Sequence, residues 1–184
     1  MKNAFFTAIL GSIFAVAMPV PASAFEISIE AFLCPIESLN EIDTEDWSPT
    51  LAENNGQLNE AQLDQLTSAV LGCAEKLNWS EDDTASALEL SLAILGGTAM
   101  SDKLLLNGVS AEYYEIVLDD RTNDELRQIL SDPSNSPALD QLAAMMVEEL
   151  GSTLTDEIAG DLGAYIGFTA QSRYSTLKLM GMAD

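Results

Sequence analysis

Two cysteines, Cys34 and Cys73, are the residues of this sequence best suited to chemistry at a single atom. A cysteine acts as a nucleophile when a neighbour such as histidine lowers the pKa of its thiol, but the chain contains no histidine. In an oxidising compartment an even pair of cysteines forms a disulfide instead. That bridge would close a loop of 73 − 34 = 39 positions. Whether the cysteines are free thiols or form a disulfide therefore depends on the compartment in which the protein resides.

The first 24 residues indicate export. Lys2 supplies a positive charge, residues 4–18 are almost wholly apolar, and residues 22–24 read Ala-Ser-Ala, a small-x-small cleavage site. This is the layout of a secretory signal peptide, and the apolar run is shorter than the roughly 20 residues of a membrane-spanning helix. We therefore predict a periplasmic or secreted protein of 184 − 24 = 160 residues, with a disulfide between Cys34 and Cys73 and no stable membrane insertion after cleavage.

The run Ser-Glu-Asp-Asp at residues 80–83 offers three carboxylates to a metal ion. Adjacent residues of a helix point in different directions, so these side chains converge poorly on one ion. The same run suits a helix N-terminus, because Ser80 fits the N-cap position, Asp83 lies at the third helical position and acidic residues favour the positive end of the helix dipole. We interpret the run as a helix cap and predict no metal site here.

Gly56 stands where a calcium-binding loop places its sharp turn. Such a loop needs oxygen ligands at its first, third, fifth and twelfth positions, which here are Leu51, Glu53, Asn55 and Gln62. The first has no side-chain oxygen and the last has no carboxylate. The sequence therefore favours a glycine turn before a helix over a calcium site.

No set of catalytic residues emerges from the rest of the chain. The absence of histidine excludes a Ser-His-Asp triad and a histidine-ligated zinc site. Two of the 30 acidic residues could together hydrolyse a glycosidic bond, but nothing in the sequence selects the pair. The sequence favours a non-enzymatic protein without a cofactor, and a carboxylate-based glycan hydrolase is an alternative.

Three aromatic residues, Trp79, Tyr113 and Tyr114, are the candidate partner-binding residues. Aromatic side chains contribute strongly to protein interfaces, and all three lie near acidic residues in the sequence. The alternative is a place in the core, where aromatic residues are often at least partly buried.

The chain carries 30 acidic and 7 basic residues, which gives a net charge of −23. Loss of Lys2 with the signal peptide leaves 6 − 30 = −24 on the mature chain. This charge disfavours nucleic acid and anionic lipid as partners and favours a protein with a basic surface. Adaptation of the surface to a salty medium is the alternative interpretation, since net charge acts on solubility and association.

These candidate residues lie in a pattern of amphipathic helices separated by turn signals. We predict an all-α fold, a single compact bundle of about five to seven helices with an extended N-terminal arm held by the disulfide. After the signal peptide, residues 25–57 form the arm, with a short strand or irregular segment to residue 39 and an acidic loop over 40–57, and residues 58–184 form the helical domain. The predicted helices cover 58–78, 80–97, 110–118, 122–130, 137–150 and 155–179, with Gly96-Gly97 ending or kinking the second.

Gly160, Gly163 and Gly167 are spaced three and four residues apart in the last predicted helix. This pattern lets another helix approach closely, and charged residues along the same helix make a membrane span improbable. We expect this face to contact a neighbouring helix, and it is the candidate surface for a homo-oligomer.

The leading hypothesis from the sequence is a non-enzymatic binding protein of the periplasm. It would be an inhibitor or immunity-type protein for a basic cell-envelope enzyme or toxin, because opposite charges speed encounter and suppress wrong partners. The alternative is a structural or accessory envelope protein that self-associates.

Overall fold

The computed structural model of the chain describes residues 33–38 and 47–182, and every regular element in these two ranges is helical. The predicted all-α bundle is therefore confirmed. The disulfide is confirmed as well, since Cys34 and Cys73 are bonded to each other. The predicted signal peptide, residues 1–24, lies outside the described residues, and the division into arm and helical domain stays a prediction.

Local sequence signals determine where most of the helices begin. Asn59, Ser80 and Thr122 each accept a hydrogen bond from the backbone N–H of the third helical residue, whose side chain in turn accepts one from the cap residue. Thr155 caps the last helix with a single such bond, whereas the predicted cap Ser110 makes none. These bonds satisfy N–H groups that have no partner within the helix. The elements are α3 (Ser48–Glu53), α4 (Glu60–Leu77), α5 (Glu81–Leu106), the 3-10 helix η2 (Ala111–Leu118), α6 (Asn123–Ser131), η3 (Pro133–Asn135), α7 (Pro137–Leu150), η4 (Gly151–Thr153) and α8 (Asp156–Leu179).

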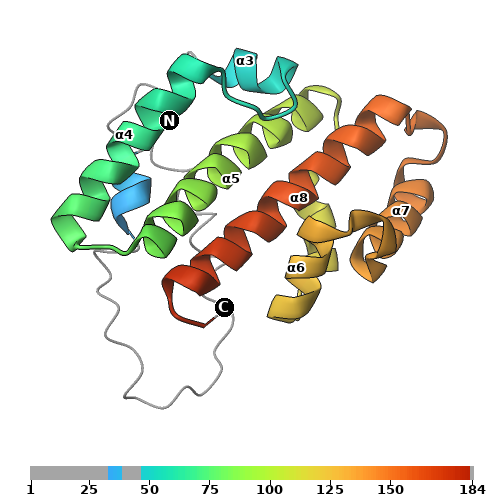
Figure 1. Ribbon diagram of the computed structural model, residues 1–184. Helices are drawn as coiled ribbons and strands as arrows, with labels where there is room; N and C mark the ends of the chain where they lie inside the picture. Colours follow the sequence, from blue (N-terminus) through green and yellow to red (C-terminus); the bar gives the residue numbers. More distant parts are fainter. Residues whose placement is uncertain (1–32, 39–46, 183–184) are drawn as a thin grey trace.

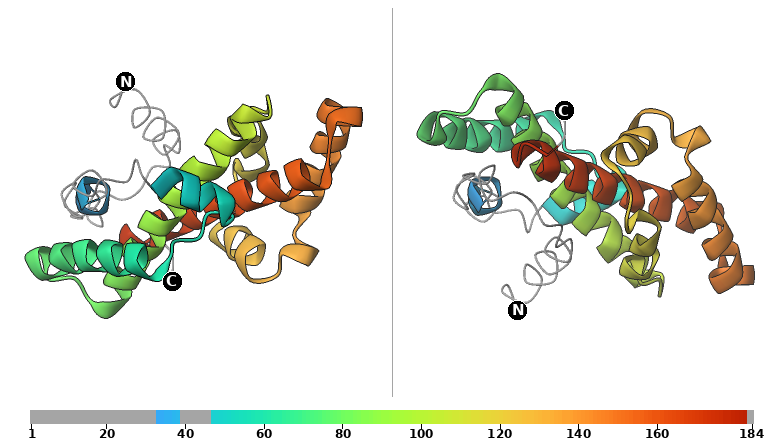
Figure 2. Two further views of the ribbon diagram at one scale, coloured as in Figure 1. Left: turned by 90° about the horizontal axis from the view of Figure 1, so that it is seen from above. Right: turned by 90° about the horizontal axis from the view of Figure 1, so that it is seen from below.

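Helices α5 and α8 form the centre of the bundle and run antiparallel (Figure 1). Lys103, near the end of α5, donates a hydrogen bond to Asp161 near the start of α8, with the two atoms 2.8 Å apart. Gln171 of α8 donates to Glu89, in the first half of α5, at 3.1 Å. Helix α4 packs along α5 on one side, and α6 and α7 lie on the opposite side, beyond α8 (Figure 2).

The ring of Phe168 on α8 packs directly against the backbone of two glycines. A Cβ atom on Gly56, in the turn after α3, would lie 2.4 Å from the ring, and a Cβ atom on Gly96 of α5 would lie 2.6 Å from it. Helix α5 continues through Gly96-Gly97 to Leu106, so the helix does not end at this pair. Tertiary packing of the ring offsets the helix propensity lost at each glycine, which is about 1 kcal/mol.

Substitutions of the two adjacent glycines of α5 are expected to change stability in opposite directions. Gly96→Ala places a methyl group 2.6 Å from the Phe168 ring, and this overpacking is expected to lower the free energy of unfolding by about 1–3 kcal/mol. Gly97→Ala is the matched control, because its methyl group meets Phe168 at 3.6 Å, an ordinary contact. Its better helix propensity is expected to raise the free energy of unfolding by up to about 1 kcal/mol. Urea unfolding followed by circular dichroism checks both variants, and equal midpoints would contradict the packing described here.

The segment at residues 33–38, predicted as a strand or irregular, is helical. Its Cys34 lies with its Cα atom 6.0 Å from that of Cys73 on α4, and Ile36 is buried. Ser38 donates a hydrogen bond to the carbonyl oxygen of Cys34 at 2.8 Å. Burial against α4, which no local pattern reveals, accounts for the difference.

Helix α3 lies within the stretch that was predicted as an acidic loop. Pro49 occupies its first turn, where a proline costs no hydrogen bond. Trp47 and Leu51, four residues apart and therefore on one side of the helix, are both buried. Because the stretch is rich in acidic residues, the sequence predicts a loop here. Trp47 and Leu51 nevertheless pack into the core of the bundle.

Candidate partner-binding surface

The structure separates the three aromatic residues that were predicted to bind a partner. Tyr113 is exposed to 53% of its possible surface, whereas Tyr114 is exposed to only 3%. Trp79 is partly buried and packs against the core. Tyr114 and Trp79 therefore take the alternative predicted for them, a place in or against the core, and Tyr113 is the one of the three that protrudes.

The geometry of η2 explains why two adjacent tyrosines differ so strongly. In a 3-10 helix three residues make one turn, so side chains three apart line up. Ala111, Tyr114 and Val117 form the buried row. Tyr113 and Ile116, exposed to 53% and 56%, form a second row that faces outward.

The exposed ring of Tyr113 is held in place by two contacts. Its ring meets that of the buried Tyr114 edge to face, with centroids 5.2 Å apart and planes at 88°. Its hydroxyl donates a hydrogen bond to Oε1 of Glu149 on α7 at 3.2 Å. The negative charge of Glu149, the hydrogen bond to it and, more weakly, the charge of Glu148 raise the pKa of Tyr113, so the phenol stays protonated and remains a donor.

Tyr113 lies at the end of the bundle where α5 and α7 end and α8 begins. The contacts Lys103–Asp161 and Tyr113–Glu149 bring these three helix ends together. The last two residues of α5 are Leu105 and Leu106, with exposures of 64% and 89%. We call this surface the end face; it comprises the exposed apolar side chains and the carboxylates beside them: Leu105, Leu106, Glu112, Tyr113, Ile116, Glu148 and Glu149.

Two carboxylates of the end face, Glu148 and Glu149, are placed against the preference of the helix that carries them. Glu148 and Glu149 lie in the last turn of α7, which contains no basic residue. The carboxyl end of a helix bears partial negative charge, so acidic residues there are unfavourable. Helix stability therefore does not explain this pair. The two carboxylates, together with the partial negative charge of the helix end, make the end face strongly negative.

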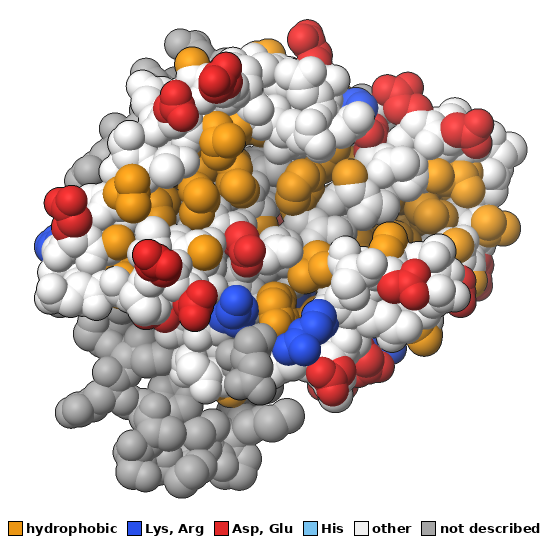
Figure 3. All heavy atoms as spheres, viewed as in Figure 1, with side chains coloured by type: hydrophobic (Ala, Val, Ile, Leu, Met, Phe, Trp, Pro, Cys, Tyr) orange, Lys and Arg blue, Asp and Glu red, His pale blue; other side chains and the backbone are white. Residues whose placement is uncertain are grey.

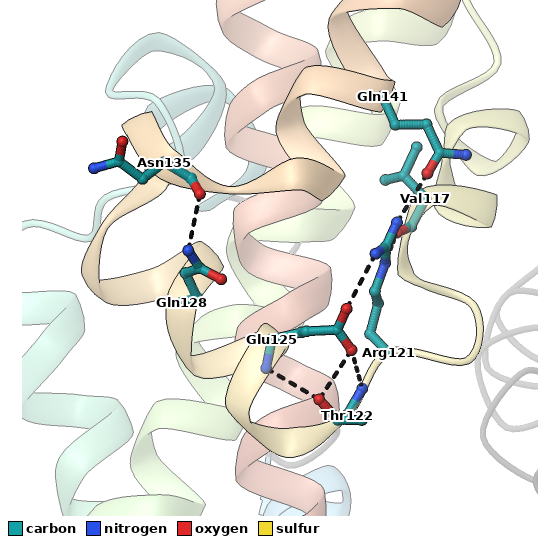
Figure 4. Close-up of polar contacts among 7 residues, drawn as sticks. All are labelled: Val117, Arg121, Thr122, Glu125, Gln128, Asn135 and Gln141. Atoms are coloured by element: carbon teal, nitrogen blue, oxygen red, sulfur yellow. Dashed lines mark hydrogen bonds and ion pairs between the residues drawn. The ribbon is translucent and has the colours of Figure 1, made fainter.

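Three partly buried basic side chains, in contrast, contact groups of the same chain, and Arg121 shows how (Figure 4). Its Nε donates to the carbonyl oxygen of Val117 at 2.8 Å, its Nη1 to Glu125 at 3.3 Å and its Nη2 to Gln141 at 2.8 Å. A guanidinium carries several donors in a fixed plane, so one side chain can reach several acceptors. Arg121 thereby joins η2, α6 and α7.

Arg173 plays the corresponding role on α8. Its Nη1 donates to the carbonyl oxygen of Leu118 at 2.9 Å, and its guanidinium lies 3.6 Å from Glu115 and 3.5 Å from Asp119. Glu115 also accepts a hydrogen bond from the hydroxyl of Tyr165. Burial, followed by the bond to Glu115 and its charge, raises the pKa of Tyr165 far above its ordinary value. No local pattern of residues predicts this polar cluster, because its members come from two separate elements, η2 and α8.

The other basic residues of the described ranges are also accounted for. Lys103 contacts Asp161 at 2.8 Å and Glu157 at 3.6 Å, and the guanidinium of Arg127 lies 5.7 Å from the centre of the Tyr174 ring. Two more lysines, Lys76 and Lys178, lie in the last turns of α4 and α8, where a positive charge is favourable. On the face drawn in Figure 3, carboxylates are scattered around the edge, hydrophobic side chains form a band across the middle, and some basic side chains are also visible.

The two acidic stretches considered for metal binding have structural roles. Ser80 and Asp83 form the predicted capping box of α5, with bonds of 3.1 Å in both directions. Gly56 lies in the predicted turn and has φ of +81°, a conformation that glycine adopts without strain. Within the part of the chain that the structure describes, no three acidic or cysteine side chains come close enough to hold a metal ion.

The predicted glycine face of α8 is open. A Cβ atom on Gly160, Gly163 or Gly167 would meet nothing within 4 Å. The close contact between α5 and α8 is made at Gly96, on α5. Self-association through this face stays a prediction.

Fold and surface together define an all-helical, disulfide-bonded protein with a strongly acidic exterior. Comparison with known proteins adds no relative, since no protein family, no curated protein and no solved structure matches this chain. Among the described residues, no helix has the length and apolar character that crossing a membrane requires. The disulfide is compatible with an extracellular location.

Proposed function

We propose that the protein is a non-enzymatic binding protein of the periplasm that captures a partner with a basic surface. In this role it would inhibit or neutralise a cationic enzyme or toxin of the cell envelope. The signal peptide predicted from the sequence and the disulfide of the structure support the compartment. The charge distribution supports the class of partner.

The observation that supports this proposal most directly is that three basic side chains are paired within the chain, whereas most carboxylates are not. The guanidinium groups of Arg121 and Arg173 and the ammonium group of Lys103 are neutralised by carboxylates of the same chain. Most carboxylates on the surface have no such partner, and the full chain carries a net charge of −23. A surface of this kind attracts a cationic protein from a distance and repels anionic surfaces.

Affinity capture tests this function directly. The mature protein, immobilised through its C-terminus, is exposed to an extract of the producing cell's envelope at low salt and then washed at high salt. We expect the retained proteins to be richer in lysine and arginine than the extract and to be released by salt, because screening weakens attraction between exposed charges. A captured enzyme, once purified, should form a complex of fixed stoichiometry and lose activity in it. Retention that is indifferent to salt, of proteins no more basic than the extract, would contradict the proposal.

A further inference from the structure

Resting on the proposed function, the geometry points to the end face as the docking surface and to Tyr113 as its central residue. We infer that an arginine of a basic polypeptide stacks on the exposed ring of Tyr113, beside the carboxylates of Glu148 and Glu149. Apolar side chains next to that arginine pack on Ile116, Leu105 and Leu106.

Tyr113 suits this role because its ring is already fixed before a partner arrives. The edge-to-face contact with buried Tyr114 and the hydrogen bond to Glu149 hold the side chain in one orientation. A side chain that is ordered in the free protein loses little conformational entropy on binding.

The surroundings of the ring select a guanidinium group. A planar cation stacks favourably on an aromatic face. Glu149 accepts the tyrosine hydroxyl through Oε1 only, and its Oε2 accepts no hydrogen bond from the described residues. That oxygen is therefore free to accept an N–H group of a guanidinium. Glu148, whose charge also acts on Tyr113, adds to the negative potential beside the ring.

The apolar part of the end face favours a polypeptide over an isolated cation. Ile116 follows Tyr113 by one turn of η2, or about 6 Å along the helix axis, and is exposed to 56%. Leu106 is exposed to 89% at the end of α5. Exposed apolar patches rimmed by polar residues are typical of protein–protein contact sites. A second copy of this chain or an anionic membrane would meet the same negative charge, so neither fits this surface.

The test uses a short fluorescently labelled peptide in which arginine and leucine alternate. Binding to the mature protein is measured by anisotropy, and the same peptide with citrulline in place of arginine removes the charge while keeping the shape. We expect Tyr113→Ser to weaken binding of the arginine peptide about tenfold, Glu149→Gln to weaken it about threefold, and Tyr113→Phe to retain most of it. The citrulline peptide should bind at least about tenfold more weakly than the arginine peptide.

Matched substitutions on α4 separate this surface from the general charge of the protein. Leu71 is exposed to 49% and Glu75 is also exposed, and Leu71→Ser and Glu75→Gln are expected to leave the affinity unchanged. Thermal unfolding of Tyr113→Ser should match that of the unaltered protein. If the arginine peptide binds but Tyr113→Ser has no effect, or the α4 variants weaken binding equally, the end face is excluded and the proposed function stands. If the unaltered protein binds neither the peptide nor basic proteins of the extract, both proposals fall.

Discussion

Removal of the Cys34–Cys73 disulfide is expected to lower the free energy of unfolding by about 4 kcal/mol, from the loop-closure entropy of a loop of 39 positions. The bond lowers the conformational entropy of the unfolded chain, and it also links residues 33–38 to α4. Cys34 and Cys73 are both buried, so alanine is the appropriate replacement because it introduces no buried hydroxyl. The variant Cys34→Ala/Cys73→Ala, compared with the oxidised protein by urea unfolding, provides the measurement.

Reductant supplies the control for this prediction. It should destabilise the unaltered protein by a similar amount and leave the double variant unchanged, because the variant has no thiol. Helicity of the folded state should decrease little in either case, since the disulfide acts at one edge of the bundle. A decrease of less than about 1 kcal/mol in the free energy of unfolding would mean that the bond contributes almost nothing to stability, and it would contradict the role assigned to the disulfide.

The second large effect is expected at the Lys103–Asp161 pair that joins α5 to α8. The Asp161 side chain is only 5% exposed, and its Oδ2 already has no hydrogen-bond partner. Lys103→Met leaves this carboxylate without its cation in a buried position, so we expect the free energy of unfolding to fall by about 3 kcal/mol. Lys178→Met is the control, because Lys178 makes no ion pair with the described residues, and it should change stability by less than about 0.5 kcal/mol.

Two further measurements distinguish the ion pair from simple loss of packing at Lys103. The double variant Lys103→Met/Asp161→Leu should recover much of the loss, because replacing both partners by apolar groups leaves no unpaired charge. The hydrogen bond to Asp161 is the main cause that raises the pKa of Lys103 above its ordinary value of 10.5. The stabilisation is therefore complete below about pH 10.5 and is lost as the pH rises through the higher pKa of the folded state. The unaltered protein should lose stability over that alkaline range, and Lys103→Met should not show this loss.

The parts of the fold that could be predicted from the sequence are those specified by neighbouring residues. The caps at Ser80, Thr122 and Thr155 are local, since each cap residue bonds a backbone group three residues away. The predicted starts of α5, α6 and α8 are correct for this reason. The end of α5 could not be predicted, because the close contact of Gly96 with the ring of Phe168, more than 70 positions further along the chain, is a feature of the tertiary structure.

The candidate site shows the same division. Composition was sufficient to predict an acidic surface, and it drew attention to Tyr113 and Tyr114 equally. Which of the two is exposed depends on which side of η2 packs against α5, α7 and α8, and these helices lie elsewhere in the chain. Glu149, Leu105 and Leu106 were not predicted, because their place beside Tyr113 requires three helix ends to meet.

The sequence by itself determined the helical class, the cysteine pairing, most helix starts and the excess of negative charge, all of which depend on residue types and short-range bonds. Only the tertiary structure decided that Lys103, Arg121 and Arg173 contact carboxylates of the same chain, that α5 passes unbroken through two glycines, and that one tyrosine is presented on an acidic, apolar end face. These features come from contacts between segments far apart in the chain, and the free energy of such contacts depends on which surfaces the folded bundle brings together.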